Sequence, residues 1–135
     1  VGELVSTYKK KKRKSLPFIN LSTNIASLTA WSNDFNYKNY IARELSGTAN
    51  RGDVLVLIST SGGNIAKKQS LNLIEAAKFA KIKKIDLVSF LGSKGGSLKK
   101  YSKISYIVKS NNTPVIQENH KLIFHLISEI LDQYY

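Results

Sequence analysis

The segment that most constrains the fold of this chain begins at Gly52, ends at Asn64 and reads Gly-Asp-Val-Leu-Val-Leu-Ile-Ser-Thr-Ser-Gly-Gly-Asn. Residues 54–58 are apolar without polar alternation, which is typical of a strand in a parallel sheet with helices covering both faces. A polar turn follows the strand directly. The sequence therefore predicts an α/β domain in which the carboxyl end of this strand is open to a ligand.

Three hydroxyl residues and two glycines form the turn that ends this strand. Phosphate needs donors that converge without bulk; Ser59, Thr60 and Ser61 supply hydroxyls, and the glycines let backbone N–H groups approach. A helix expected directly after the turn would add a dipole that favours an anion. A plain helix cap is the alternative, but one cap needs only one such side chain. We expect a phosphate site and no nucleotide cofactor, because no Gly-Lys-Ser/Thr completes a P-loop.

The rest of the pattern predicts a doubly wound, mainly parallel sheet of the flavodoxin-like type. Further strands are expected at residues 18–21, 85–88 and 104–108, and helices at 38–45, 65–81 and 115–134. Pro114 immediately precedes the last of these helices, where proline suits a first turn. With 135 residues and no low-complexity linker, residues 1–135 are expected to form a single domain.

The chain is strongly basic, with 21 Lys and Arg against 9 Asp and Glu and a net charge of +12. This balance favours an anionic partner, either a phosphorylated metabolite or a nucleic acid. The basic run at residues 9–14 is bordered by a single aromatic residue, Tyr8, so we interpret it as a solvated surface and do not expect nucleic acid. The chain has no cysteine and no apolar run of membrane length, and we expect a cytoplasmic protein without a membrane partner.

Short motifs spread over the whole chain share one resemblance. Besides the turn described above, they are Tyr8-Lys9, Ser15-Leu16-Pro17, Ser27-Leu28-Thr29-Ala30, Asn33-Asp34-Phe35, Ala42-Arg43, Gly95-Gly96 and Ile116-Gln117-Glu118-x-His120. In order and spacing they resemble the phosphoheptose isomerase branch of the SIS (sugar isomerase) domain family. The resemblance implies a SIS fold that is truncated here, because the family's N-terminal helices, first strand and first Gly-rich loop would precede Val1.

The resemblance also implies an activity, the isomerisation of sedoheptulose 7-phosphate to D-glycero-D-manno-heptose 7-phosphate through an enediol. This reaction feeds heptose into bacterial surface polysaccharides such as lipopolysaccharide. Such a reaction needs a general base near carbon and a group that handles oxygen protons. The family pattern gives these roles to Glu3 and His125, and substrate contacts to Asn33, Asp34 and Gln117. On pattern alone, a histidine in an apolar helix stripe is more often a core residue, and a glutamate near a terminus faces solvent. His120 matches a further family position without an assigned chemistry.

Three further expectations come from the resemblance. Zinc, which some relatives bind, would be held by Glu3, Gln117 and His125, with a fourth ligand upstream of Val1. The second phosphate-loop position, a serine in the family, falls on Asn64, or on Ser70 if an insertion precedes it. The assembly implied is a homotetramer with active sites shared between subunits.

A different class of function stays open at this point. Some SIS proteins of this lineage are non-catalytic adaptors associated with replication initiation, which bind a phosphosugar or a protein partner. The presence of Glu3, Gln117 and His125 together favours the enzyme, because an adaptor has no reason to keep all three.

Overall fold

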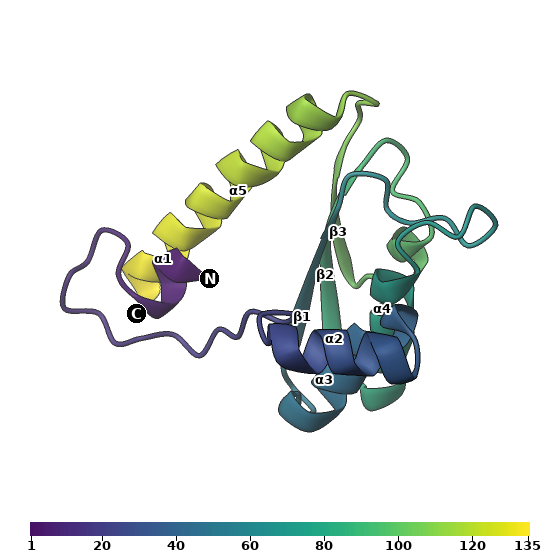
Figure 1. Cartoon of the computed structure of the whole chain (residues 1–135). Helices are drawn as coiled ribbons and strands as arrows, with labels where there is room; N and C mark the ends of the chain where they lie inside the picture. The colour runs from purple at the N-terminus through teal and green to yellow at the C-terminus, as the bar shows by residue number, and fades with distance from the viewer.

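The computed structural model describes residues 1–135 without a gap. Its elements are α1 (Gly2–Val5), α2 (Ile25–Asp34), the 3-10 helix η1 (Tyr37–Asn39), α3 (Tyr40–Thr48), β1 (Val54–Ser59), α4 (Leu71–Lys83), β2 (Asp86–Gly92), the 3-10 helix η2 (Leu98–Tyr101), β3 (Ile104–Val108) and α5 (Thr113–Tyr134). The three strands form one parallel sheet in the order β1-β2-β3, with helices beside it (Figure 1). The predicted α/β class with a parallel sheet is confirmed.

The main hydrophobic core lies between the sheet and the helices α3 and α4. In β1, Leu55, Leu57 and Ser59 are buried on this side, and in the paired register they lie next to Leu87, Ser89 and Leu91 of β2. Helix α4 packs its small side chains and Ile74 against them, with Ala76, Ala77 and Ala80 fully buried. Small residues on α4 allow the helix to approach the sheet closely, and α4 forms the crossover that parallel strands require.

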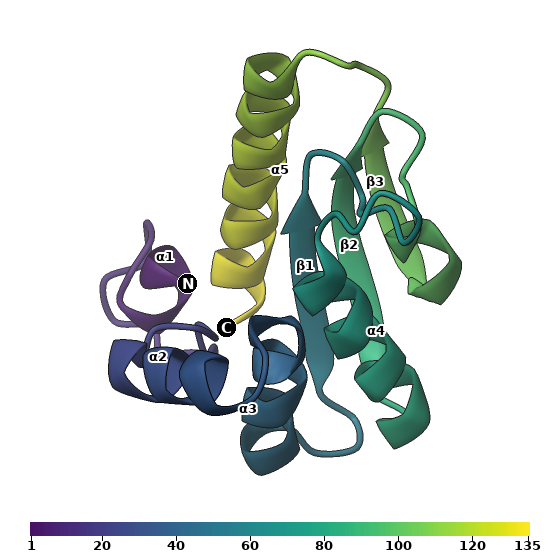
Figure 2. The same ribbon diagram turned by 45° about the vertical axis from the view of Figure 1, so that its right-hand side comes forward.

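Helix α5 packs on the face of the sheet opposite α4 (Figure 2), mainly against β2 and β3. Phe90 of β2 points to this face and contacts the ring of Phe124 at a centroid distance of 4.5 Å. The alternate residues of β1 are left open, since Val54, Val56 and Ile58 are 58%, 42% and 51% exposed. Helices thus lie on both faces of the sheet as expected, but α5 extends over β2 and β3 and leaves the second face of residues 54–58 open.

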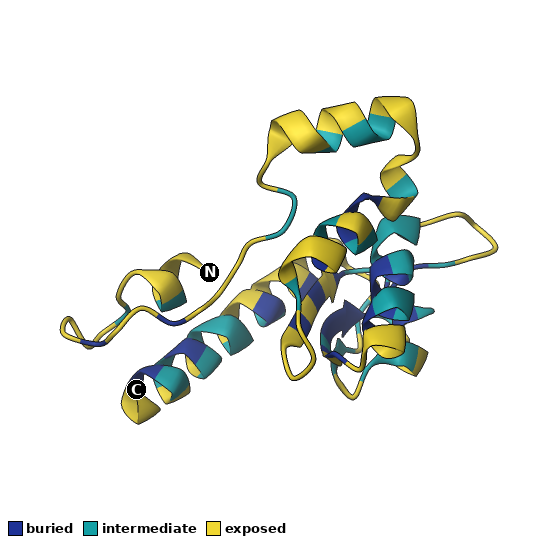
Figure 3. Ribbon diagram, turned by 90° about the horizontal axis from the view of Figure 1, so that it is seen from below, coloured by how far each residue is buried: buried dark blue, intermediate teal, exposed yellow.

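Residues 18–21 form no strand, contrary to the sequence prediction. The only backbone bond of Phe18 N–H runs to Leu16 O within the same segment, and no strand lies beside it. The segment leads instead into α2, which the sequence pattern did not predict. Helix α2 has no fully buried residue, and Figure 3 shows it only in the colours of exposed and intermediate residues.

The helix expected at residues 65–81 begins six residues later, at Leu71. Asn64 and Gln69 form a pair of backbone hydrogen bonds of 3.0 and 2.9 Å that close a loop between them. Lys68 and Ser70 both have φ +52, in the left-handed region that a helix cannot contain. The helix expected at 38–45 is divided between η1 and α3, which continues to Thr48.

The N-terminal segment lies against the C-terminal part of α5, although the two are at opposite ends of the sequence (Figure 1). Its anchor is a buried ion pair in which Arg13 Nε donates to Asp132 Oδ1 at 2.7 Å. None of the helices has the length and apolar character needed to cross a membrane.

Candidate functional site

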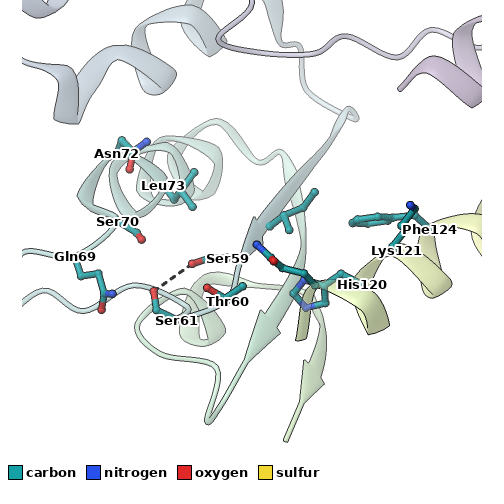
Figure 4. A pocket seen from close by; sticks show the side chains of 12 residues that line it. Ser59, Thr60, Ser61, Gln69, Ser70, Asn72, Leu73, His120, Lys121 and Phe124 are labelled. Carbon is teal, nitrogen blue, oxygen red and sulfur yellow. Dashed lines mark hydrogen bonds between the residues drawn. The ribbon is translucent and has the colours of Figure 1, made fainter. Parts of the chain in front are cut away.

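A pocket of about 530 Å³ opens where the carboxyl end of β1 meets the first turn of α4 and one face of α5. Figure 4 shows Ser59, Thr60 and Ser61 between the side chains of α4 and those of α5. The residues that line it are Ile58, Ser59, Thr60, Ser61, Gln69, Ser70, Asn72, Leu73, Gln117, His120, Lys121 and Phe124. The volume lies within the range of small-molecule sites, and the lining is mostly polar.

The turn after β1 is held by its own hydroxyl groups. Ser59 Oγ accepts a hydrogen bond from Gly62 N–H at 3.1 Å, and Ser61 Oγ accepts one from Gly63 N–H at 3.2 Å. The two glycine N–H groups are thus bonded inside the turn and are not free to bind an anion. This differs from the expectation that the glycines let backbone N–H groups approach a phosphate. Ser59 Oγ and Ser61 Oγ also lie 3.4 Å apart, so one of their two hydroxyl hydrogens can bond the other oxygen. An anion in the pocket still meets a hydroxyl donor that the backbone holds in place.

A second glycine-rich loop fixes the shape of this turn. Gly62 has φ +69, and a Cβ atom added to it would lie 2.1 Å from Gly95 O. Gly62 O and Gly63 O accept hydrogen bonds of 2.9 Å from Leu98 N–H and Ser97 N–H. A side chain at Gly62 would both strain the backbone and separate the two loops, which explains the glycine there.

The first turn of α4 contributes donors that nothing else in the chain uses. Ser70 occupies the N-cap position but its side chain makes no cap hydrogen bond, and the structure gives no acceptor for the N–H groups of residues 71–73. Unpaired N–H groups at a helix start favour an anion through their own dipoles and that of the helix. Of the two alternatives for the second loop position, Ser70 lies in the pocket and Asn64 does not.

One face of α5 closes the other side of the pocket. Gln117, His120, Lys121 and Phe124 recur at the three- and four-residue spacing of a helix face. Of these four, only Gln117 is expected as a substrate contact from the family pattern. Lys121, which brings a cation to the pocket, shares its helical spacing. Gln69, Asn72 and Leu73 also line the pocket but are not expected there, because the sequence pattern predicts a helix that starts earlier than α4.

His120 is part of the core as well as of the pocket wall. It is 2% exposed, and its Nε2 lies 3.1 Å from Leu91 O. A carbonyl oxygen can only accept, so Nε2 carries the proton and Nδ1, which has no partner, is an acceptor in the neutral ring.

The residues expected to perform catalysis lie outside this pocket in the single chain. Glu3 is exposed on α1, and half-buried His125 stacks on Tyr8 with 6.4 Å between ring centroids. Asn33 and Asp34 are exposed at the end of α2, where Asn33 Nδ2 donates to Asp34 Oδ1 at 3.0 Å.

The same separation bears on the expected zinc site. Gln117 and His125 are eight residues apart on α5, an axial rise of about 12 Å. No group of three or more His, Cys, Asp or Glu side chains in the chain could hold a metal ion. The residues of one chain therefore do not form a zinc centre by themselves.

Fold and pocket together define a class of protein. A parallel α/β sheet that presents hydroxyl groups, unpaired helix N–H groups and a lysine at the carboxyl end of a strand is suited to bind a phosphorylated small molecule.

Comparisons with known proteins identify the particular family. The chain is 39% identical over 132 residues to a phosphoheptose isomerase of Nitratiruptor sp., covering 98% of this chain and 67% of the relative. It is 38% identical over 134 residues to a phosphoheptose isomerase of Helicobacter pylori, covering 99% and 66%. Among solved structures, a phosphoheptose isomerase from Francisella tularensis superposes with a TM-score of 0.87 and 30% identity, over 97% of this chain and 67% of that one.

The chain belongs to the phosphoheptose isomerase family, whose SIS fold it shares, and it spans about two thirds of the length of these relatives. No protein-family model matches it. The resemblance found from the motifs is thereby confirmed.

Proposed function

We propose that this protein is a sugar-phosphate isomerase that converts sedoheptulose 7-phosphate to D-glycero-D-manno-heptose 7-phosphate. The observation that carries the proposal is the pocket, in which hydroxyls of residues 59–61, Ser70 and the unpaired N–H groups of α4 line one space. The phosphate end of an open-chain sugar matches these donors. Family membership supplies the reaction class, and the relatives found are named as isomerases, which gives the adaptor alternative no support.

The proposed chemistry moves one proton between two adjacent carbons. Glu3 takes the carbon-bound proton as its carboxylate and returns it to the neighbouring carbon of the enediol. His125 moves the accompanying proton between the two sugar oxygens, so no net proton is gained or lost. Gln117 orients the substrate, and Asn33 and Asp34 hold a hydroxyl group.

The proposal includes an assembly, because Glu3 and His125 do not line the pocket of their own chain. A second copy can bring them to it, and we propose a homotetramer with shared sites. Support comes from apolar side chains that the single chain leaves exposed on β1 and α5: Val54, Val56, Ile58, Leu122, Leu126 and Ile130. Light scattering at micromolar concentration tests the oligomer, and a monomer would contradict it.

Combining two impaired variants tests whether sites are shared. Glu3→Gln lacks the proposed base and Ser61→Ala has an impaired phosphate turn. Co-expressed subunits are expected to regain part of the activity, because some shared sites receive both intact residues. No activity above that of the separate variants would contradict shared sites.

A zinc site is proposed only for the assembled protein. Assembly would need to bring Glu3, Gln117 and His125 together, and a fourth protein ligand would complete the coordination of the metal. Metal analysis of the purified protein tests this, with Gln117→Ala and His125→Ala expected to lose the metal. Unchanged metal content in both variants would contradict the assignment.

The experiment that tests the reaction is turnover of sedoheptulose 7-phosphate by the protein as its gene encodes it. Glu3→Gln and His125→Ala are expected to lower kcat by about 10²–10⁴-fold each, while substrate binding changes much less. Ser61→Ala is expected to weaken binding first, and Ser46→Ala, an exposed hydroxyl on α3, serves as the matched control. No turnover by the unmodified protein, with or without zinc, would refute the proposed function.

The proposed product belongs to heptose synthesis for bacterial lipopolysaccharide, which we place in the cytoplasm because a charged sugar phosphate does not cross a bilayer freely. Expression of the protein in a heptose-deficient bacterial strain is expected to restore full-length lipopolysaccharide. Cell fractionation checks the location.

A further inference from the structure

We propose that Arg13 and Asp132 are positioning residues that hold the backbone of Glu3 against α5, the helix that carries His125. This inference rests on the function proposed above, and it assigns a role to two residues that do not touch the pocket.

The Arg13 guanidinium connects three separate parts of the chain. Besides its bond to Asp132, it donates from Nη2 to Glu3 O at 3.1 Å and from Nη1 to Leu4 O at 3.0 Å. Nη1 also donates to Lys14 O at 2.7 Å, which fixes the side chain to its own loop. One planar group therefore contacts α1, the basic loop and α5 at the same time.

These contacts matter to α1 because that helix has only four residues. A helix so short is not stable by itself, and its last carbonyl groups have no partners within it. Arg13 supplies the donors for Glu3 O and Leu4 O, and Leu16 N–H adds a bond of 3.1 Å to Leu4 O. The direction of the Glu3 side chain thus depends on the position of the guanidinium.

Asp132 fixes the other side of the arrangement. Its Oδ2 accepts the backbone N–H groups of Lys9 at 3.1 Å and Lys10 at 2.7 Å, directly after Tyr8. Tyr8 in turn stacks on His125, which lies seven residues, or about two helical turns, before Asp132 on α5. One carboxylate therefore joins both the segment after Tyr8 and, through Arg13, α1 to the helix that carries the histidine.

The burial of this pair points to geometry as its role. The side chains of Arg13 and Asp132 are 0% and 6% exposed, and neither leaves a buried polar atom without a partner. Removing two charges from water offsets most of the attraction between them, so such a pair adds little to stability compared with apolar residues. A fully satisfied pair instead defines one arrangement of the segments that it joins.

The test is a double-variant cycle on the whole protein with sedoheptulose 7-phosphate. Asp132→Asn and Arg13→Lys are each expected to lower kcat about 10- to 100-fold by misplacing Glu3, with KM changed less than about threefold. Arg13→Lys keeps the charge but cannot span three partners, so it covers the case in which Asp132→Asn folds poorly. In the Glu3→Gln background, either substitution is expected to lower kcat less than about twofold further, because the misplaced group is already gone.

Two controls separate positioning from general loss of stability or charge. Ile85→Val weakens the core directly before β2, and Asp86→Asn breaks the exposed pair with Lys103. Both are expected to keep kcat. Two results would overturn the positioning role while leaving the isomerase proposal intact. One is that the losses of kcat caused by Asp132→Asn and by Glu3→Gln multiply in the double variant. The other is that Ile85→Val, at the same melting temperature as Asp132→Asn, loses as much kcat. An unmodified protein without turnover would overturn both.

Discussion

Replacing Gly62 with alanine tests whether the neighbouring loop shapes the candidate phosphate turn. Gly62 has φ +69, and the new Cβ would lie 2.1 Å from Gly95 O. The left-handed backbone costs a non-glycine residue about 1–2 kcal/mol. Overpacking adds about 1–3 kcal/mol, because the opposing atoms belong to the backbone and cannot change rotamer. We expect the free energy of unfolding to fall by about 2–5 kcal/mol in total.

Two other glycines are matched controls in the same urea titration. Gly52 has φ +96 with no atom within 4 Å of an added Cβ, so Gly52→Ala is expected to carry only the backbone cost, about 1–2 kcal/mol. Gly47 lies in α3 with open space around it, and Gly47→Ala is expected to stabilise the protein by about 0.5–1 kcal/mol. If Gly62→Ala and Gly52→Ala are equally destabilised, the close approach to Gly95 does not shape the turn and the reasoning is refuted.

Ser70→Ala is expected to weaken phosphate binding about tenfold, because a hydrogen bond to a charged group is lost, whereas Asn64→Ala, outside the pocket, is expected to change it less than about twofold. Calorimetry with inorganic phosphate measures both affinities, and equal losses would contradict the pocket geometry. Ile74→Ala removes a side chain that is 0% exposed and is expected to lower the free energy of unfolding by about 2–5 kcal/mol, with a loss below about 1 kcal/mol arguing against the core described here. Burial acts to raise the pKa of the Asp132 carboxyl, but the hydrogen bonds from Arg13, Lys10 and Lys9 outweigh it and hold the pKa below its ordinary value. The ionised carboxyl therefore stabilises the fold at a pH above its ordinary pKa, and this contribution is lost as the pH falls below that pKa. Between about pH 5 and pH 2, the urea midpoint of the unmodified protein is expected to fall more steeply than that of Asp132→Asn. Parallel curves for the two proteins would contradict this.

The sequence predicted best those elements whose pattern is local. The strand expected at residues 104–108 has these bounds in the structure. The long apolar stripe of the last helix predicts its start within two residues of the observed one. The position of the turn hydroxyls at a strand end is predicted for the same reason, because a strand, three hydroxyl residues and two glycines are contiguous in the chain.

The errors arose where tertiary contacts decide the outcome. Residues 18–21 have the composition of a strand but no neighbouring strand to pair with. The delayed start of α4 depends on the bonds between Asn64 and Gln69 and on two left-handed residues that are not glycine. Helix α2 begins after Asn24, whose Oδ1 accepts a hydrogen bond from Ser27 N–H. It has no buried residue, so its sequence has no clear helical repeat of apolar residues by which it could be predicted.

Candidate catalytic residues could be named from the family pattern but not placed by it. The spacing of Gln117 and His125 predicts a shared helix face, yet only Gln117 lines the pocket. His125 turns toward Tyr8, a contact that joins the first ten residues to the last helix and that no local pattern contains.

The bond between Arg13 and Asp132 spans 119 residues, nearly the whole chain. On a ribosome that adds about 5–20 residues per second, Asp132 is synthesised about 6–24 s after Arg13. During that interval the sheet and its helices can form, whereas Arg13, which donates to the carbonyl groups of α1, has no carboxylate to hold its side chain in place. The segment that carries the proposed catalytic base is thus made before α5 but fixed only after it, and a nascent chain that stops short of α5 leaves Arg13 without its carboxylate partner.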